Sequence, residues 1–371
     1  MSDRDALLHN IITHKFADGD HFFIPSSFRS PNSDLDLCLQ VPSSATDFTK
    51  DSHGVEAMSN LATKLSEAGL SDVDTVRLTA RIPIVKFNVP YNDDGEDFLV
   101  ECDLSLQNPL ACLNTSLLNT YSVISPTTCI LAAIIKRWAK NRGINNPSQY
   151  TLSSYGYVIM LIYFLTSCDF DKNGFVRENA SEPNPILPNL QLVDPLWAQN
   201  PALGPYREIS AKPKTLETMV CHPTEANYFV NSYFYRSELE GLKKFSGESH
   251  CANIATGALL ASFFHFFAYD FDYSKKVVSL NIKHSSPPLE KEIKAEEDGW
   301  SLFRPGLAIE DPFELFYDVA HVVKANNHQH IRKEFSLAYT KIVNAAYADG
   351  ELPNGREIID LICEPIDHDK A

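Results

Sequence analysis

The sequence lacks several features that would assign it to a specialised class of protein. Its eight cysteines form no Cys-x-x-Cys pair and have no regular spacing, which argues against a zinc ribbon or a disulfide scaffold. The longest uncharged apolar stretches, 155–165 and 254–269, are too short for a membrane span, and residues 1–20 do not have a signal-peptide pattern. We therefore expect reduced core thiols, a reducing compartment that is cytosolic or nuclear, and no membrane partner; of the two compartments we choose the cytoplasm.

Basic residues are also scarce: 32 Lys+Arg stand against 48 Asp+Glu, for a formal net charge of −16. This balance argues against a protein that coats nucleic acid by bulk charge attraction. The acids are unevenly distributed, however, because none occurs between Leu104 and Cys168. That acid-free window holds Lys136, Arg137, Lys140 and Arg142. A polyanion could bind there without repulsion from neighbouring carboxylates.

The periodicity of apolar residues predicts a β-containing N-terminal third followed by a helical remainder. We expect strands at 35–41, 81–89 and 98–106. We expect helices at 5–16, 55–68, 114–122, 127–141, 151–166, 254–269 and 312–324. The proline-rich stretch 168–205 predicts a long irregular connection, and the charged segment 289–298 predicts a solvated loop or the flank of a hairpin.

Three carboxylates lie on two of the predicted strands. Asp34 and Asp36 are two residues apart, so their side chains leave the same face of one strand, and Asp103 lies on a later strand. If the strands are neighbours, the three acids converge in the manner that two divalent cations require for displacement at phosphorus. The alternative is an edge strand whose acids face solvent.

The acid-free window contains the residue types that suit a nucleotide. Lys136 and Lys140 are four apart, on one face of a helix, and could contact phosphates. Asn114 is expected to open one helix, and Thr151 opens another in which Tyr155 offers a ring for base stacking. The alternatives are a solvated face for the lysines and ordinary helix caps for Asn114 and Thr151.

A capping box is predicted further along the chain. Asp311 is a good N-cap, Pro312 suits the first helical position, and Glu314 completes the box, with Tyr317 one turn beyond.

Taken together, these motifs resemble the terminal uridylyltransferases and cytoplasmic-type poly(A) polymerases of the DNA polymerase β superfamily, most of all the small fungal-type uridylyltransferases. The resemblance runs from about Ser26 to Arg332. It rests on segments 33–38, 80–86, 102–103, 114–115, 136–140, 151–157, 188–191 and 309–314.

The resemblance implies an α+β fold with two domains and a cleft between them. A polymerase β-like nucleotidyltransferase domain, a mixed β-sheet with helices, would span 21–125. Residues 1–20 and 126–371 would form a mainly helical poly(A)-polymerase-associated domain, which carries a nucleotide-recognition segment at 307–321. The implied activity is template-independent addition of uridines from UTP to RNA 3′ ends, with release of pyrophosphate.

The resemblance also implies the role of each site residue. Asp34, Asp36 and Asp103 would be the catalytic residues and would hold two Mg²⁺ ions, or Mn²⁺ in their place. Triphosphate contacts would come from Ser27, Lys136, Lys140 and Ser154. The ribose, the base edge and the base ring would be contacted by Asn108, Asn114, Thr115, Tyr155, Asp311, Glu314 and Tyr317.

The sequence departs from the family pattern in the segment around Ser26, in the number of residues before it, and at Tyr317. Ser26 replaces the usual glycine, the loop before Asp34 is short, and only about 25 residues precede Ser26. Tyr317 stands where uridylyltransferases typically have a histidine; its phenol would narrow the pocket against a purine and could hydrogen-bond a uracil carbonyl. This favours UTP. The alternatives are an ATP-preferring RNA adenylyltransferase and a catalytically weakened adaptor that binds RNA or protein.

The expected partners follow from the same reading. They are UTP and RNA 3′ ends, with a protein partner that delivers the RNA, and we expect the chain itself to be a monomer. Because the net charge allows few phosphate contacts, we expect a weak, distributive grip on a short 3′ end.

Overall fold

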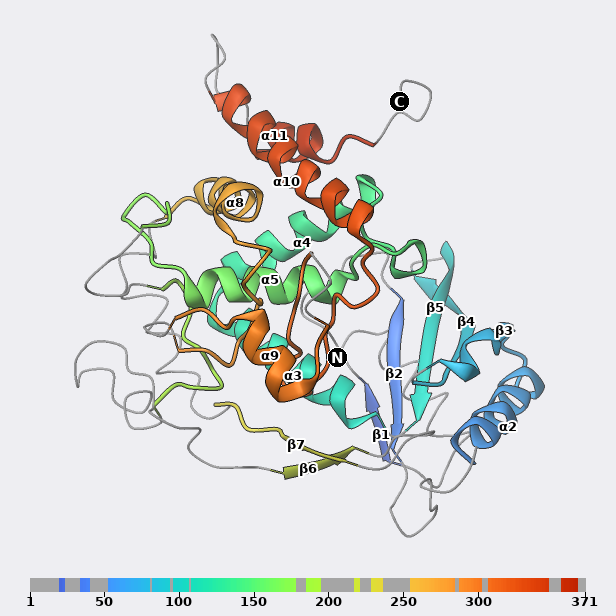
Figure 1. The fold of residues 1–371 in the computed structure, drawn as a ribbon. Helices are drawn as coiled ribbons and strands as arrows, with labels where there is room; N and C mark the ends of the chain where they lie inside the picture. Colours follow the sequence, from blue (N-terminus) through green and yellow to red (C-terminus); the bar gives the residue numbers. More distant parts are fainter. Residues whose placement is uncertain are drawn as a thin grey trace. The chain divides into compact units, whose positions relative to one another are not determined.

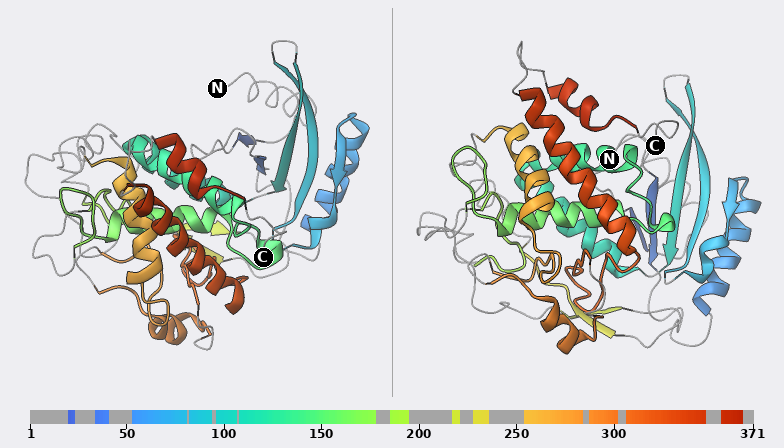
Figure 2. Two further views of the ribbon diagram at one scale, coloured as in Figure 1. Left: turned by 90° about the horizontal axis from the view of Figure 1, so that it is seen from above. Right: turned by 45° about the horizontal axis from the view of Figure 1, so that its top comes forward.

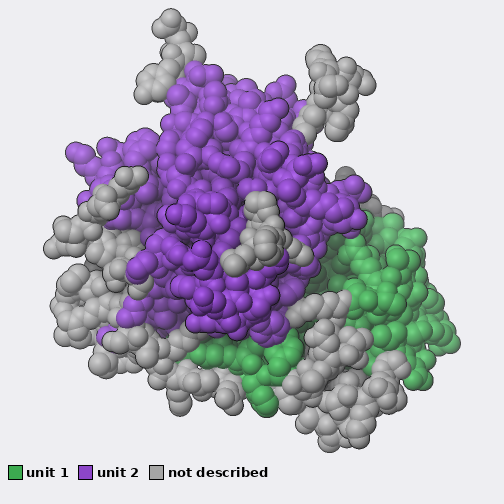
Figure 3. Space-filling model, in the orientation of Figure 1, with its two compact units in different colours: residues 1–119, 215–233 green, residues 120–214, 234–371 purple. Residues whose placement is uncertain are grey.

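The computed structural model of the chain describes residues 20–23, 34–40, 53–80, 82–93, 96–106, 108–177, 185–194, 217–220, 228–235, 254–283, 287–301, 306–346 and 355–365. These residues divide into two compact units (Figure 3). Unit 1 takes its described residues from Met1–Asn119 and Thr215–Tyr233, and unit 2 from Thr120–Lys214 and Phe234–Ala371. The helix expected at 5–16 lies outside the described residues, and the domain limits expected at 21–125 stay a prediction.

Five strands of unit 1 form one mixed sheet in the order β1-β2-β5-β4-β3 (Figure 1). They are β1 (Asp20–Phe23), β2 (Leu35–Gln40), β3 (Ser71–Asp74), β4 (Ile84–Asp93) and β5 (Glu96–Leu106). Strand β2 runs parallel to β5, whereas the other neighbouring pairs are antiparallel. The sequence predicts β2, β4 and β5; β1 and β3, with four residues each, are too short for alternation to reveal.

Helix α2 (His53–Glu67) covers one face of this sheet. Its Met58 and Leu65 are buried against strand residues such as Val85 and Phe87. Side chains alternate along a strand, so the residues between the buried ones leave the opposite face. The core under α2 therefore decides which strand residues form that second face.

Unit 1 also contains a helix and a pair of strands outside this sheet. Helix α3 (Pro109–Ile124) follows β5, and its residues up to Asn119 belong to this unit. Strands β6 (Glu217–Val220) and β7 (Tyr228–Asn231) form a separate two-stranded antiparallel ribbon.

Unit 2 is mainly helical. Its helices are α4 (Pro126–Asn141), α5 (Ser154–Ser167), α8 (Thr256–His265) with a π-helical turn at Phe266–Asp270, α9 (Lys291–Asp298), α10 (Ala325–Ala346) and α11 (Gly355–Ile362). Figures 1 and 2 show α4, α5, α8 and α10 packed together. Among the described residues, no single helix is long and apolar enough to cross a membrane; only α3 and α4 pass such a test as a pair, and they are bent by 120°.

Aromatic rings fill the centre of this bundle. Trp138 of α4 is buried, and its ring lies 4.8 Å from that of Phe264, 5.1 Å from that of Phe335 and 5.9 Å from that of Tyr157. These residues come from four different helices. Such rings bury large apolar areas and prefer the edge-to-face and tilted arrangements seen here. This contact fixes α4 and α5, two of the helices of the acid-free window, against each other and against α8 and α10.

Two sequence-based predictions in unit 2 are wrong, and one helix was missed. Segment 312–324 is not a helix but a series of turns, and segment 289–298 is not a solvated loop, because residues 291–298 form α9. The longest described helix, α10, was not predicted at all. Its buried residues His328, Ile331, Phe335 and Ala338 follow helical spacing, but they are mixed with polar neighbours that weaken the apolar pattern.

His328 of α10 links the stability of unit 2 to pH. Its side chain is buried, its Nε2 has no hydrogen-bond partner among the described residues, and its ring lies 4.7 Å from that of Tyr273. Burial, together with the charges of Arg332 and Lys291, lowers the pKa of His328 to about 4. The unfolded chain therefore binds more protons than the folded protein between pH 6.5 and pH 4.

We expect the His328→Phe variant to resist acid better than the wild type. As the pH falls from 6.5 to 4, the wild type should lose on the order of 3 kcal/mol of unfolding free energy through this one group. The variant has no group to protonate there, so that share of the loss should disappear. Urea unfolding at pH 7, 5.5 and 4.5 measures the difference. Equal pH slopes in the two proteins would contradict the assignment.

Candidate active site

The predicted carboxylates of unit 1 lie on one face of the sheet. The parallel register of β2 and β5 places Asp36 opposite Asp103, and the antiparallel register of β4 and β5 places Lys86 opposite Asp103. Asp34 immediately precedes β2, two residues from Asp36. Their neighbours Leu35 and Leu37 are buried in the core under α2, whereas Asp34 and Asp36 are exposed. Pairing of the strands thus places the three acids on the same face of the sheet.

A lysine ammonium lies between two of these acids. Lys86 Nζ is 2.8 Å from Asp103 Oδ1 and 3.6 Å from Asp34 Oδ2. Partial burial disfavours the charged form of Lys86, but the hydrogen bond to Asp103 and the charges of Asp103 and Asp34 outweigh it, so its pKa is raised. The two carboxylates therefore converge on one positive charge.

This arrangement fits a cation held by carboxylate oxygens. Asp34, Asp36 and Asp103 are hard oxygen donors of the kind that Mg²⁺ prefers, and Lys86 supplies the positive charge that their proximity requires. Among the described residues, no three His, Cys, Asp or Glu side chains are already grouped closely enough to enclose a metal. The assignment of two metal ions to these acids stays a prediction, and a metal would have to exchange with Lys86.

The predicted contacts at the end of β5 are placed differently from expectation. Helix α3 begins at Pro109, so Asn114 and Thr115 lie inside it and do not open it. Asn108 acts as its cap, because its Oδ1 accepts a hydrogen bond from Ala111 N. The Asn114 side chain keeps a buried Oδ1 that has no hydrogen-bond partner among the described residues, which is what a ligand contact would leave open. Ser26 and Ser27 lie outside the described residues.

The predicted phosphate contacts of unit 2 lie on α4 and at the start of α5. Lys136 is partly buried and Lys140 is exposed on α4. The cap of α5 is Ser153, whose side chain accepts from Gly156 N, and not Thr151 as predicted. Thr151 instead exchanges hydrogen bonds with the backbone of Asn146.

Tyr155 connects α5 to the recognition segment 307–321. Its hydroxyl donates to Asp311 Oδ2 at 2.9 Å. Burial, then the charge of Asp311 and its hydrogen bond, raise the pKa of Tyr155 well above its usual value, with a further contribution from Glu314. Tyr155 therefore stays protonated and remains the donor in this bond. Burial also raises the pKa of the Asp311 carboxyl, although the hydrogen bonds that it accepts act in the opposite direction.

Residues 310–318, which we call the recognition turn, hold the remaining predicted contacts. A bridge between Glu310 and Asp318 closes it. Asp311 Oδ1 accepts from the backbone N–H groups of Phe313 and Glu314, as in the predicted capping box, but no helix follows. The Tyr317 backbone N–H donates to Glu314 O, which leaves Tyr317 on the same turn, its ring 5.2 Å from that of His321.

The helix predicted here fails because side chains take its carbonyl groups. Lys294 donates to Leu315 O, and Trp300 Nε1 donates to Phe316 O. A helix would need those acceptors for its own backbone. Asp311, Glu314 and Tyr317 nevertheless stay together, on a turn held from outside.

Several residues that support the turn were missed from the sequence. Gln191 Nε2 donates to Pro312 O at 2.7 Å, and Asn189 Nδ2 donates to Leu280 O at 2.8 Å. Both are buried polar side chains in the irregular segment after α5. Asn189 and Gln191 lie in segment 188–191, which is one of the motifs that carry the family resemblance. That resemblance was the only feature of the sequence that pointed to these two residues. Glu310 lies in the motif segment 309–314, but its partner Lys294 gave no signal, because a buried lysine cannot be told from an exposed one by its neighbours in sequence.

Comparison with known proteins gives two matching families and several similar proteins. Residues 24–123 match the family described as poly(A) RNA polymerase, mitochondrial-like, central palm domain, and residues 256–315 match the Cid1 family poly A polymerase. The terminal uridylyltransferase Cid1 of Schizosaccharomyces pombe is 29% identical to the chain over 336 residues, which cover 87% of this chain and 67% of that protein. The chain belongs to the Cid1-like nucleotidyltransferase family.

Proteins named as poly(A) and poly(U) polymerases are also similar to this chain. The poly(A) RNA polymerase GLD2-B of Xenopus laevis is 25% identical over 85% of this chain, and the match spans about half of that protein, 50%. The structure of the Cid1 poly(U) polymerase bound to MgGTP superposes with a TM-score of 0.67 at 25% identity, covering 98% of this chain and 92% of that one. The expected fold class is thereby confirmed. The family is of the two-metal-ion type and generally depends on Mg²⁺.

Replacement of Lys86 tests whether the family's metal and this lysine share the same carboxylates. Without metal, Lys86→Met leaves Asp34 and Asp103 facing each other uncompensated, so we expect a loss of about 1 kcal/mol in unfolding free energy. Mg²⁺ should stabilise the variant more than it stabilises the wild type.

Chemical unfolding in EDTA and in Mg²⁺ measures both effects. Lys64→Met, on the exposed face of α2, is the matched control and should respond to Mg²⁺ as the wild type does. If Lys86→Met and wild type gain equally from Mg²⁺, the lysine and the metal do not compete for these acids.

Proposed function

We propose that the chain transfers nucleotides to RNA 3′ ends without a template and that its preferred substrate is UTP. The family supports the general reaction, because its members include both terminal uridylyltransferases and poly(A) RNA polymerases. The preference for UTP is the finer proposal, and it depends on the recognition turn. We also propose the cytoplasmic location and the monomeric state expected from the sequence.

The carboxylates of unit 1 would serve the chemical step. Two Mg²⁺ ions held by Asp34, Asp36 and Asp103 would supply activation of the RNA 3′ hydroxyl and charge neutralisation on the triphosphate. The chain's own contribution is the strand register, which aligns the acids before any ligand arrives. No protein nucleophile is required, and Lys136 and Lys140 would balance phosphate charge from α4.

The observation that most supports the proposed preference for UTP is the hydrogen bond between Tyr155 and Asp311. It joins a ring suited to base stacking to the turn that holds Glu314 and Tyr317. The Asp311 and Glu314 carboxylates are acceptors for a base N–H group, such as N3–H of uracil. The Tyr317 phenol can donate to a uracil carbonyl, and its bulk disfavours a purine. These features support UTP over ATP.

The first test is extension of a short RNA primer with Mg²⁺ and each of the four nucleoside triphosphates in turn. We expect UTP to be used with a kcat/KM at least about tenfold above that of ATP, the difference that one pocket contact supplies. Preferential use of ATP would support the second candidate, an adenylyltransferase, which the GLD2 relatives favour. The Asp103→Asn variant is the background control and should extend no primer. If the wild type extends the primer with none of the four nucleoside triphosphates, the result would support the alternative of a catalytically weakened adaptor.

Two substitutions of Tyr317 test its part in the choice of base. Tyr317→Phe removes only the hydroxyl and should lower kcat/KM for UTP about tenfold, because one hydrogen bond is lost. Tyr317→Ala also removes the ring and should bring ATP close to UTP. Steady-state kinetics with both nucleotides measure the ratio. An unchanged ratio in Tyr317→Ala would place the selection elsewhere.

A further inference from the structure

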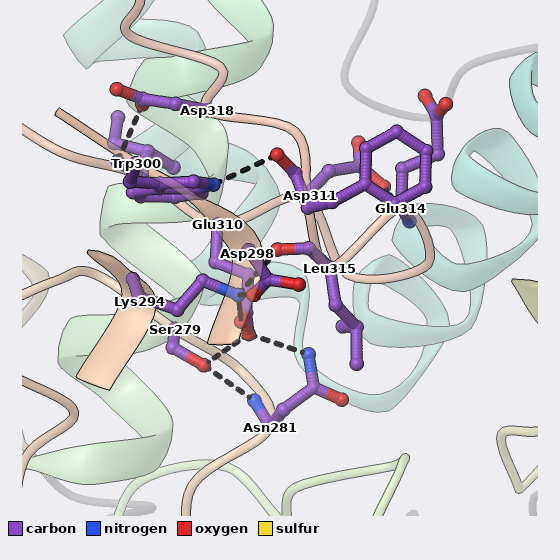
Figure 4. A network of polar contacts seen from close by, with 12 residues as sticks. Ser279, Asn281, Lys294, Asp298, Trp300, Glu310, Asp311, Glu314, Leu315 and Asp318 are labelled. Atoms are coloured by element: carbon purple, nitrogen blue, oxygen red, sulfur yellow. Dashed lines mark hydrogen bonds and ion pairs between the residues drawn. The ribbon is translucent and has the colours of Figure 1, made fainter. Parts of the chain in front are cut away.

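Lys294 of helix α9 is a buried cation that the proposed reaction does not use. Its side chain is only 3% exposed. The ammonium donates to Glu310 Oε2 at 2.8 Å, to Leu315 O at 2.5 Å and to a carboxylate oxygen of Asp298 (Figure 4). All three hydrogen-bonding positions of the ammonium are therefore in use. Lysine is rarely buried to this extent unless its charge is paired with an acid. These three contacts therefore hold the Lys294 ammonium in its buried position.

Glu310, the principal partner, is held equally firmly. Its second oxygen, Oε1, accepts from Ser279 Oγ at 2.6 Å and from Asn281 Nδ2 at 2.9 Å. Its backbone N–H donates to Val278 O. Glu310 thus connects α9 to the segment 278–281, and Figure 4 shows these side chains converging on it.

Two contacts of Lys294, Glu310 and Leu315, lie on either side of the segment that holds the predicted nucleotide contacts Asp311 and Glu314. Glu310 immediately precedes Asp311, and Leu315 immediately follows Glu314. A single ammonium therefore holds both ends of the segment 311–314. Trp300 reinforces the second end, because its Nε1 donates to Phe316 O at 2.8 Å while its ring centre lies 4.9 Å from Lys294 Nζ.

The charges in this part of unit 2 require such a cation. Glu310, Asp311 and Glu314 occur within five positions, and all three are buried. Burial opposes the charged form of Lys294, but Glu310 and Asp298 outweigh it and raise its pKa, so it is charged at neutral pH. Without Lys294, Glu310 would be a buried charge that faces only neutral donors. Opening of the turn would then become more favourable, because water would hydrate the Glu310 carboxylate.

We propose that Lys294 is a positioning residue for nucleotide recognition: by clamping Glu310 and Leu315, it holds the Asp311 and Glu314 carboxylates in the arrangement that selects the base. This inference rests on the proposed function. It assigns to α9 a part in substrate specificity, although none of its residues is among the predicted contacts.

The main test compares Lys294→Met with a matched control, Lys291→Met. Lys291 is the other buried lysine of α9, one turn earlier, and donates to Tyr273 O and Gly306 O, outside the recognition turn. In Lys294→Met we expect KM for UTP to rise about tenfold, kcat to change less than about threefold, and the preference for UTP over ATP to fall. Lys291→Met should lose stability but keep the wild-type KM and preference.

A second variant separates positioning from stability. Lys294→Met combined with Glu310→Gln removes both members of the ion pair, so Glu310 no longer leaves a buried charge without its cation and much of the thermal stability should recover. The clamp stays absent, so KM should stay high. Recovery of KM together with stability would show that Lys294 acts only through stability, and would overturn the proposal. If Lys294→Met does not fold, this double variant carries the comparison with wild type.

Hydrogen exchange provides a readout that does not depend on activity. Peptides covering 309–318 should lose protection in Lys294→Met and in the double variant, but not in Lys291→Met. Unchanged protection would overturn the clamp whatever the enzyme does. If the wild type transfers no nucleotide, the proposed function fails, and calorimetric binding of UTP then replaces KM: weaker binding in Lys294→Met supports the clamp, and equal binding overturns its role in recognition.

Discussion

The parallel pairing of β2 with β5 is the constraint on which the carboxylate face depends. It places Asp36 opposite Asp103, and the adjoining pairing of β4 with β5 brings Lys86 to the same position on the sheet. A slip of one residue would exchange each acid for its apolar neighbour, and Leu35 or Leu37 would leave the core under α2. Burial of the leucines therefore fixes the position of the acids. The hydrophobic effect on one face holds charges of the same sign together on the other.

Each unit holds a group of carboxylates with one lysine, but the two lysines differ in exposure. Lys86 is partly exposed and bridges Asp34 and Asp103, so we expect that another cation can replace it. Lys294 is buried with three acceptors, and water has no access to assist its removal. The same ion-pair chemistry thus suits an exchangeable charge in unit 1 and a permanent support in unit 2. In a chain with a net charge of −16, these single lysines set the local geometry of the acids.

Much of unit 1 could be predicted because its signals are local. Alternation in 35–41 and 98–106 identified both strands and the face that carries the acids. In unit 2 the helices α4 and α5 were predicted, but 312–324 was wrongly taken as a helix. Its capping box is real, since Asp311 does bond the two backbone N–H groups. The next carbonyl groups, Leu315 O and Phe316 O, accept hydrogen bonds from Lys294 and Trp300. The sequence of segment 312–324 does not indicate these donors, because they come from another part of the chain.

The sequence by itself determined the carboxylate strands, the acid-free window and the family of the chain, because these depend on residue types at fixed spacing along one segment. Only the tertiary structure decided which lysines are buried, that Tyr155 bonds Asp311, and that the recognition turn replaces a helix. These outcomes depend on desolvation and on hydrogen bonds between segments far apart in the chain. The residues of segment 289–298 are mostly polar, which is typical of a solvated segment. The segment nevertheless contains Lys294, on which the recognition turn depends. Lys294 is buried because its ion pair with Glu310, a residue distant in the sequence, compensates the buried charge of each.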